Sequence, residues 1–414
     1  MNRYDNERLS AFAVLESLRA GVPTRASTKA LPDLRPSLLE IFKEDLKIFA
    51  EGRNLPGKFV WGKYGQGKTH VLASIEHMAL DMGFAVSRVS LSREVSCHNL
   101  FHFYSKVAVP LRTPNSTVFG LQRIINQKTA SELPNSPIQN EGRYVHPLPA
   151  LIFEDYFRTE GEEQDTLYGY LMGNPPSDFK SIHKKAWGEK PALKFERKFK
   201  PSEHATAYFG VLADAIVFCG FKGWVILIDE LELVARLGKI SRLNAYRNLN
   251  WLLNWSNTMT YPIYTVCAAA TDLQDVFWYP TDPRRMADSR EIPLLAEERF
   301  GKMVSGELQK FFKMAVDPSN PQIKPVAEDD LINVLTEVVK LYKIAYKGDP
   351  QINLKELIQH VGNQPIRTHL RATLEALDIQ QLYQKEILPD ASSLIATSLE
   401  EQADFFFNPN NGRN

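Results

Sequence analysis

Apolar positions along this chain alternate between two patterns, helical spacing and short continuous runs. Helical spacing predicts helices over residues 5–20 and 36–52 before the first continuous run. Short runs bounded by turn residues are typical of buried strands of a parallel sheet. These runs lie at 58–62, 84–91, 223–230 and 261–270. Strands separated by helical segments predict an α/β fold, in which helices flank a parallel sheet.

Residues 113–203 differ from the segments on either side. Prolines recur there and long periodic runs are few, so we expect an insertion that carries short helices near 150–160 and 163–172. Periodicity then resumes with a helix over 204–219, ahead of the strand at 223–230.

The last third of the chain reads as helical throughout. Helices are expected over 294–316, 327–345, 352–361 and 365–383. The resulting division is a helical segment (1–55), an α/β core (56–292, with the insertion), a helical lid (293–385) and a carboxyl-terminal tail (386–414).

The composition of the chain excludes some classes of protein. The 414 residues carry 49 basic and 49 acidic side chains, so any contact with nucleic acid must come from a local patch. Three widely separated cysteines argue against a disulfide framework and fit a reducing compartment. No apolar run approaches the length of a membrane helix or a signal sequence, so we expect a cytoplasmic protein without membrane contact.

Residues 62–69 have the pattern G-x-x-x-x-G-K-T between a strand and a helix, the context of a Walker A loop. Its glycines let backbone N–H groups surround phosphates, Lys68 would reach the β- and γ-phosphates of ATP, and Thr69 would bind Mg²⁺. A chance match is the alternative. The expected nucleotide-binding residues are Gly62, Tyr64, Gly65, Gln66, Gly67, Lys68, Thr69 and His70.

The run at 223–230 ends in two carboxylates and predicts a Walker B strand. Asp229 would hold Mg²⁺, and Glu230 would orient and deprotonate the attacking water. A helix that merely begins with acidic residues is the alternative. Thr271 stands at the tip of the next strand, where ATPases of the AAA+ class place a polar residue that hydrogen-bonds that water or the γ-phosphate. We expect this role for Thr271, and a Thr-Asp helix cap is the alternative.

Several arginines are candidates for the charge that develops during phosphoryl transfer. Arg284, Arg285 and Arg290 follow the last strand, and Arg285 or Arg290 could reach the nucleotide of a neighbouring subunit in a homo-oligomer. Residues 362–371 resemble the helix start from which an arginine of an AAA+ lid reaches back towards the γ-phosphate. Arg367 is the first candidate for this role and Arg371 the second. Each of these arginines could instead be solvated.

A basic and aromatic stretch closes the insertion. Lys184, Lys185 and Lys198 are interleaved with Trp187 and other aromatics over residues 180–200, a composition that suits phosphate contact and base stacking on DNA. The alternative is a solvated loop anchored by its aromatics.

Residues 15–24, which end in Gly21-Val22-Pro23-Thr24, and residues 61–70 resemble the P-loop ATPases of BREX-type bacterial phage-defence systems, in particular the smaller, BrxD-like ones. The likeness extends more loosely to residues 90–94, the Walker B strand and the lid helix. It implies an ATPase of the AAA+ superfamily that works beside a helicase or other defence proteins.

The resemblance favours an enzyme that hydrolyses ATP and acts on DNA or loads a partner onto it. A nucleotide-gated scaffold or sensor, which assembles with defence partners without acting on DNA itself, is the alternative. The sequence leaves open the trigger and the number of subunits.

Overall fold

The computed structural model describes residues 3–20, 25–32, 34–116, 118–188, 195, 197–282, 284 and 286–383. The chain divides into two compact units, which are treated separately below. The smaller unit comprises Met1–Ile41, Trp61–Ile75 and Gln322–Asn414, and the larger comprises Phe42–Val60 and Glu76–Pro321. The expected tail, 386–414, lies outside the described residues.

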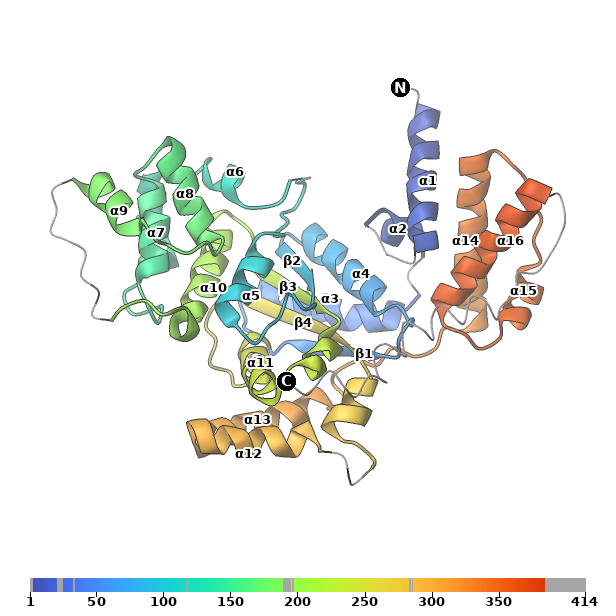
Figure 1. The fold of residues 1–414 in the computed structure, drawn as a ribbon. Helices are drawn as coiled ribbons and strands as arrows, with labels where there is room; N and C mark the ends of the chain where they lie inside the picture. The colour runs from blue at the N-terminus through green and yellow to red at the C-terminus, as the bar shows by residue number, and fades with distance from the viewer. Residues whose placement is uncertain are drawn as a thin grey trace. The chain divides into compact units, whose positions relative to one another are not determined.

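A four-stranded sheet has the strand order β1-β4-β3-β2 (Figure 1), and all of it except the last two residues of β1 belongs to the larger unit. Its strands are β1 (Lys58–Gly62), β2 (Ala85–Ser90), β3 (Trp224–Asp229) and β4 (Ile263–Ala270). The pairs β2–β3 and β3–β4 are parallel, and every residue of β3 and β4 is buried. The predicted α/β architecture, a parallel sheet flanked by helices, is confirmed.

Four helices follow these strands or lie between them along the chain. They are α4 (Lys68–Asp81), α5 (Leu100–Ala108), α10 (Pro201–Phe218) and α11 (Lys239–Leu252). Helix α5 packs against β2 and α10, and α11 packs against β4. Helix α3 (Pro36–Ala50) precedes β1, and its Phe49 stacks on Phe84 with ring centroids 5.2 Å apart.

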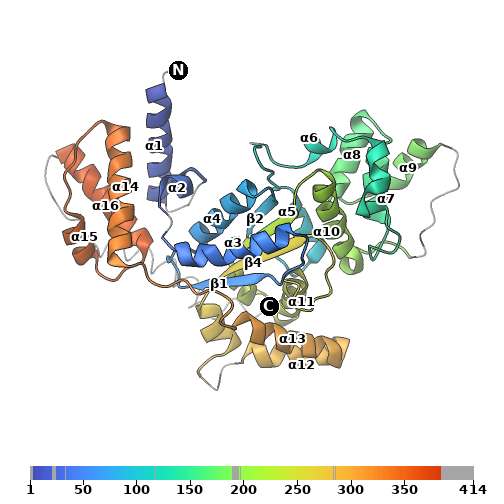
Figure 2. The ribbon, with the colours of Figure 1, turned by 180° about the vertical axis from the view of Figure 1, so that it is seen from behind.

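The predicted insertion folds into short helices beside α10 (Figures 1 and 2). Helices α7 (Leu148–Tyr156) and α8 (Gly161–Leu171) match the two expected ones. Helix α6 (Gln122–Ile125), two 3₁₀ turns and α9 (Phe179–Trp187) were not predicted. Helix α9 does carry apolar residues at helical spacing, including buried Phe179 and Ile182, but it spans only nine residues and lies in the basic stretch, so its pattern was not assigned to a helix.

The single helix expected over 294–316 is two helices, α12 (Asp288–Phe300) and α13 (Lys302–Ala315). Gly301, with φ of +91°, separates them, because only glycine adopts this left-handed conformation readily. The pair packs on itself and on α11, within the larger unit (Figure 1). The compact division therefore places 293–321 with the sheet, whereas the sequence suggested a lid beginning at 293.

The smaller unit combines the two ends of the described chain (Figures 1 and 2). Helix α1 (Arg3–Ala20) packs on α14 (Glu328–Tyr346) and α16 (Ile366–Tyr383), and α15 (Leu354–Val361) packs on both of the latter. Val14 and Leu15 of α1 are buried in one cluster with Val338 and Leu377. Residues 1–41 of the expected amino-terminal segment therefore share their core with the carboxyl helices.

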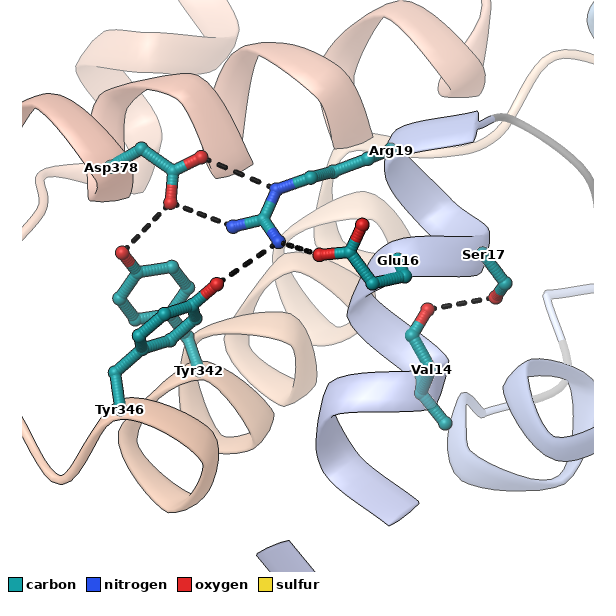
Figure 3. A network of polar contacts seen from close by, with 7 residues as sticks. All are labelled: Val14, Glu16, Ser17, Arg19, Tyr342, Tyr346 and Asp378. Atoms are coloured by element: carbon teal, nitrogen blue, oxygen red, sulfur yellow. Dashed lines mark hydrogen bonds and ion pairs between the residues drawn. The ribbon is translucent and has the colours of Figure 1, made fainter. Parts of the chain in front are cut away.

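A polar network reinforces this packing (Figure 3). Arg19 of α1 donates hydrogen bonds to both carboxylate oxygens of Asp378, at 2.7 and 3.3 Å, and to Tyr346 Oη at 3.2 Å. Tyr342 also donates to Asp378, at 2.8 Å. Helix α1 is thereby joined to α14 and α16 by directed bonds as well as by apolar burial.

Candidate nucleotide-binding site

The predicted Walker A loop leads from β1 into α4 in the smaller unit. Gly65 and Gly67 have φ of +74° and +88°, a region that other residues rarely adopt. Gln66 steadies the loop, because its side chain accepts a hydrogen bond from Lys63 N at 2.7 Å. Successive backbone N–H groups in such a turn form a concave site for an anion.

Lys68 begins α4 and is buried, with 7% of its surface exposed. Its Nζ lies 3.3 Å from Gly62 O and 3.4 Å from Lys63 O. These long contacts fold the ammonium back over the loop, the position from which a lysine can meet phosphate. Thr69 and His70 follow in the first turn of the helix and are half-buried.

The start of α16 lies against this loop within the same unit. A Cβ placed on Gly65 would lie 2.8 Å from Cβ of Pro365, so the two backbones approach as closely as glycine allows. Arg367 donates to Tyr64 Oη at 3.4 Å, while Nε of Arg371 is buried without an acceptor among the described residues. Of the two lid arginines that the sequence singled out, Arg367 therefore contacts the loop directly.

Arg35 is a neighbour of the loop that the sequence analysis missed. A Cβ placed on Gly67 would lie 3.6 Å from Arg35 Nη1. Arg35 immediately precedes Pro36, the first residue of α3, and matches no motif. Only the three-dimensional arrangement of the smaller unit identifies it.

The predicted Walker B residues lie at the end of β3 in the larger unit. Asp229 is buried, with 2% of its surface exposed, and its Oδ1 accepts a hydrogen bond from Glu230 N at 2.9 Å. Glu230 itself is exposed and has φ of +55°. A left-handed conformation is costly for glutamate, and such strain is concentrated at functional sites.

Thr271 follows the last residue of β4, the strand that neighbours β3. Its carbonyl accepts hydrogen bonds from Gln274 N and Asp275 N, so the cap of the following turn is made by the backbone. The hydroxyl makes no hydrogen bond within the described part of the chain. The Thr271 side chain therefore does not cap the following turn, since the backbone carbonyl does so.

Glu232 is a second residue near the candidate site that the sequence motifs did not indicate. It is buried, and its Oε2 accepts a hydrogen bond from Ala270 N at 2.9 Å, which ties the segment after β3 to the end of β4. An acidic residue two positions after Glu230 could have been noticed, but the pattern does not reveal that it turns inward. Glu232 positions the backbone next to Thr271.

The arginine candidates of the larger unit are spread along one segment. Arg285 lies outside the described residues. Arg290, in the first turn of α12, is 68% exposed and lies 3.6 Å from Glu291, and Arg284 is also exposed. Arg284 and Arg290 are thus exposed, and contact of Arg290 with a neighbouring subunit stays a prediction.

The aromatics of the basic stretch are used within the fold. Trp187 donates to buried Asp155 at 2.7 Å and carries the guanidinium of Arg158 on its face at 3.6 Å. Phe199 packs edge-on against Phe101 and Tyr208. These rings anchor the insertion, which agrees with the alternative of a loop held by its aromatics. Burial raises the pKa of Asp155, against the opposing hydrogen bonds from Trp187 and His183.

The lysines of that stretch are exposed: Lys184 and Lys198 reach solvent, and Lys185 pairs with Glu163 at 2.6 Å. A separate cavity of about 740 Å³ in the larger unit is lined by parts of α5, α10, α11 and α13, and by none of the predicted nucleotide residues. The cavity and the sequence motifs therefore mark different places in the fold.

The donor set is consistent with ATP and Mg²⁺. Asp229 offers a buried carboxylate whose Oδ2 accepts no hydrogen bond from the described residues, and oxygen ligands are what Mg²⁺ prefers. No three His, Cys, Asp or Glu side chains in the described ranges are grouped as a protein-only metal site, and Mg²⁺ usually completes its shell with water and phosphate. None of the described helices is long and apolar enough to span a bilayer.

Comparison with known proteins yields one family. The sequence profile of the BREX system ATP-binding protein BrxC/D matches residues 7–132 and 201–385, and it passes over 133–200, within the predicted insertion. No curated protein shows a significant match.

Two solved structures resemble the chain weakly. One is the Aeropyrum pernix ORC2 protein in ADPNP–ADP complexes, at 13% identity and a TM-score of 0.35, over 90% of this chain and 69% of that one. The other is the Aeropyrum pernix ORC1 protein in complex with DNA, at 11% identity and a TM-score of 0.34, over 90% and 67%. Scores this low carry no argument about function.

Proposed function

The chain belongs to the BREX system ATP-binding protein BrxC/D family, and we propose that it binds ATP at residues 62–70 and hydrolyses it. The observation that carries the proposal is the loop itself: Gly65 and Gly67 are left-handed and Lys68 is buried at the start of α4, an arrangement suited to binding an anion. Family membership supports nucleotide binding and a place in a bacterial defence system.

The proposed hydrolysis assigns one task to each residue. Lys68 neutralises the β- and γ-phosphates, and Arg367 supports the γ-phosphate from the helical lid. Glu230 accepts a proton from water that attacks in line, and Thr271 orients that water. When bound by Thr69 and Asp229, Mg²⁺ supplies charge neutralisation at the phosphate oxygens.

The strands give this assignment its main support. Asp229 and Thr271 stand at the carboxyl ends of two parallel, adjacent strands, and the Walker A loop follows another strand of the same sheet. Ligands of open α/β sheets bind at the carboxyl ends of the strands. A homo-oligomer would add Arg285 or Arg290 of a neighbour to the γ-phosphate.

For the biological task, we propose that the ATPase acts on DNA, or loads a partner such as a helicase onto it, through Lys184, Lys185 and Lys198. The exposure of Lys184 and Lys198 supports contact with phosphates. Base stacking is not part of the proposal, because Trp187 and Phe199 are packed within the fold.

A nucleotide-gated scaffold is the second candidate. It is favoured by the same packing of the aromatics and by the balanced charge of the chain, since both reduce the expected affinity for DNA. In this case ATP controls assembly with defence partners, and hydrolysis resets it.

The test is an ATPase assay with and without single- and double-stranded DNA, beside a mass measurement with a non-hydrolysable ATP analogue. Lys68→Ala should abolish nucleotide binding, and unchanged binding would contradict the proposed site. DNA-stimulated turnover that is lost when Lys184, Lys185 and Lys198 become alanine supports the DNA role. The matched control replaces Lys302, Lys310 and Lys313, three exposed lysines of α13. Analogue-dependent assembly without DNA stimulation supports the scaffold.

A further inference from the structure

Arg35 has separate backbone and side-chain roles. Its carbonyl accepts hydrogen bonds from Leu38 N and Leu39 N, both at 3.1 Å, and so caps the first turn of α3. Its side chain extends to the Walker A loop, with Nη1 3.6 Å from the place of a Cβ on Gly67. A substitution of the side chain therefore leaves the helix cap in place.

The guanidinium of Arg35 meets few acceptors among the described residues. Nη2 donates to Lys324 O at 3.3 Å. Nε and Nη1 are buried, and neither meets an acceptor among the residues that the structure describes. Buried donors without a partner are destabilising, so native proteins rarely retain them unless a ligand or water completes the bond. Burial also lowers the pKa of this guanidinium, as expected for a buried cation without a bound anion.

We propose that Arg35 binds the phosphate oxygens of a nucleoside di- or triphosphate held by the Walker A loop. A guanidinium is the side chain best suited to this, because its forked donors match phosphate oxygens. Loops of this type hold the α- and β-phosphates with their backbone N–H groups. Contact beside Gly67, directly before Lys68, therefore places Arg35 at the part of the nucleotide that ADP and ATP share.

This inference rests on the proposed nucleotide function of the loop and adds a ligand from outside the Walker motifs. Arg367 contacts the loop at Tyr64, whereas Arg35 lies beside Gly67. Arg35 also directly precedes α3, so phosphate binding would connect the nucleotide to the amino-terminal residues of the smaller unit. The nucleotide would then be held by the amino-terminal segment as well as by the loop.

Affinity for ATP, ADP and adenosine is to be measured by calorimetry on the full chain carrying Arg35→Gln or Arg35→Lys. Loss of a charge-assisted contact should weaken the binding of ATP by about 10- to 100-fold. The binding of ADP should weaken by a similar factor. Adenosine binding should not change, and lysine should recover part of the loss. Arg8→Gln is the matched control, because Arg8 is a half-buried arginine of the same unit whose Nε donates to the carbonyl of Ala345.

The outcomes separate this inference from the function on which it rests. If Lys68→Ala loses ATP while Arg35→Gln binds it as the unsubstituted chain does, the loop binds nucleotide and the role of Arg35 is refuted. If the unsubstituted chain binds neither ATP nor ADP, the proposed function fails first. Equal losses for adenosine and ATP, or an equal loss in Arg8→Gln, would show a general structural effect and overturn the assignment. Circular dichroism establishes that each variant is folded.

Discussion

Arg19 of α1 and Asp378 of α16 form a two-point ion pair, with Nη2–Oδ1 at 2.7 Å and Nε–Oδ2 at 3.3 Å. Tyr342 donates to the same carboxylate, and Tyr346 accepts from the same guanidinium. The pair is partly shielded, with 24% of the Arg19 side chain and 36% of the Asp378 side chain exposed. It joins segments 359 residues apart.

Removal of this pair should destabilise the smaller unit. Arg19→Met or Asp378→Asn is expected to lower the free energy of unfolding by about 1 to 2 kcal/mol, because each leaves a partly buried partner without its counter-charge. The double variant should lose less than the sum of the two. Urea unfolding followed by circular dichroism measures this. Glu16→Gln, at a 66% exposed partner of Arg19, should cost less than about 0.5 kcal/mol, and an equal cost would count against the model of a specific pair.

Replacement of Glu230 by glutamine should separate binding from turnover. The amide cannot accept a proton from water, so hydrolysis should fall by at least about 100-fold while ATP remains bound. Single-turnover hydrolysis and equilibrium binding of ATP measure the two effects. Glu232→Gln is an informative comparison, because it keeps an acceptor for Ala270 N and should retain most activity. Hydrolysis at the original rate in Glu230→Gln would remove Glu230 from the mechanism.

The contact between Gly65 and Pro365 can be tested with alanine. Gly65→Ala forces a residue at φ of +74° and a Cβ at 2.8 Å from Pro365, so the loop or the start of α16 must shift. Gly52→Ala is the control, with φ of +79° and no atom within 4 Å of the new Cβ. Both substitutions should cost about 1 to 2 kcal/mol of stability, because alanine disfavours a positive φ. Only Gly65→Ala should also weaken the binding of ATP. Pro365→Gly in the same chain should restore part of that affinity.

Because His369 is buried, we expect the stability of the folded chain to depend on pH. Burial lowers its pKa from the ordinary value of 6.5, although bonds to the backbone of Gly362 and Gln364 oppose the shift. The unfolded chain therefore binds the proton more readily than the folded one, and stability present above pH 6.5 is lost as the pH falls below it. The loss is at most about 1.4 kcal/mol per pH unit from this one group.

This effect is measured from the midpoints of urea unfolding at about pH 7.5, 6.5 and 5.5. These values extend roughly one pH unit to either side of the ordinary pKa of histidine. His369→Gln should flatten the decline at acid pH, because the variant has no imidazole at this buried position. An identical acid slope in His369→Gln and the unsubstituted chain would mean that His369 does not titrate in this way.

The sequence was most informative where one local pattern determines one structure. Continuous apolar runs gave β3 at Trp224–Asp229 and β4 at Ile263–Ala270 close to their expected ends, because burial on both faces leaves a clear signal. Gly65 and Gly67 likewise have the left-handed conformations that a phosphate loop requires. Local chemistry was enough in these places.

Partnership between distant segments was not predictable from one sequence. The apolar positions of α1 indicate that it buries a face, but they do not say that Val338 and Leu377 cover it. Arg35 is invisible for the same reason, because its role depends on a loop more than 25 residues further along the chain. The actions of Glu230, Thr271 and Arg290 stay predictions, since they depend on a nucleotide and, for Arg290, on a second subunit.

The packing of α1 on α14 and α16 also bears on how the chain is made. A ribosome that adds about 5 to 20 residues per second needs roughly 20 to 70 seconds to pass from Arg19 to Asp378, 359 residues later. During that interval Val14 and Leu15 remain exposed, because the helices that bury them have not yet been synthesised. The segment that contains α1 therefore exposes apolar side chains until α14 and α16 have been made, and such surfaces are prone to aggregation during synthesis.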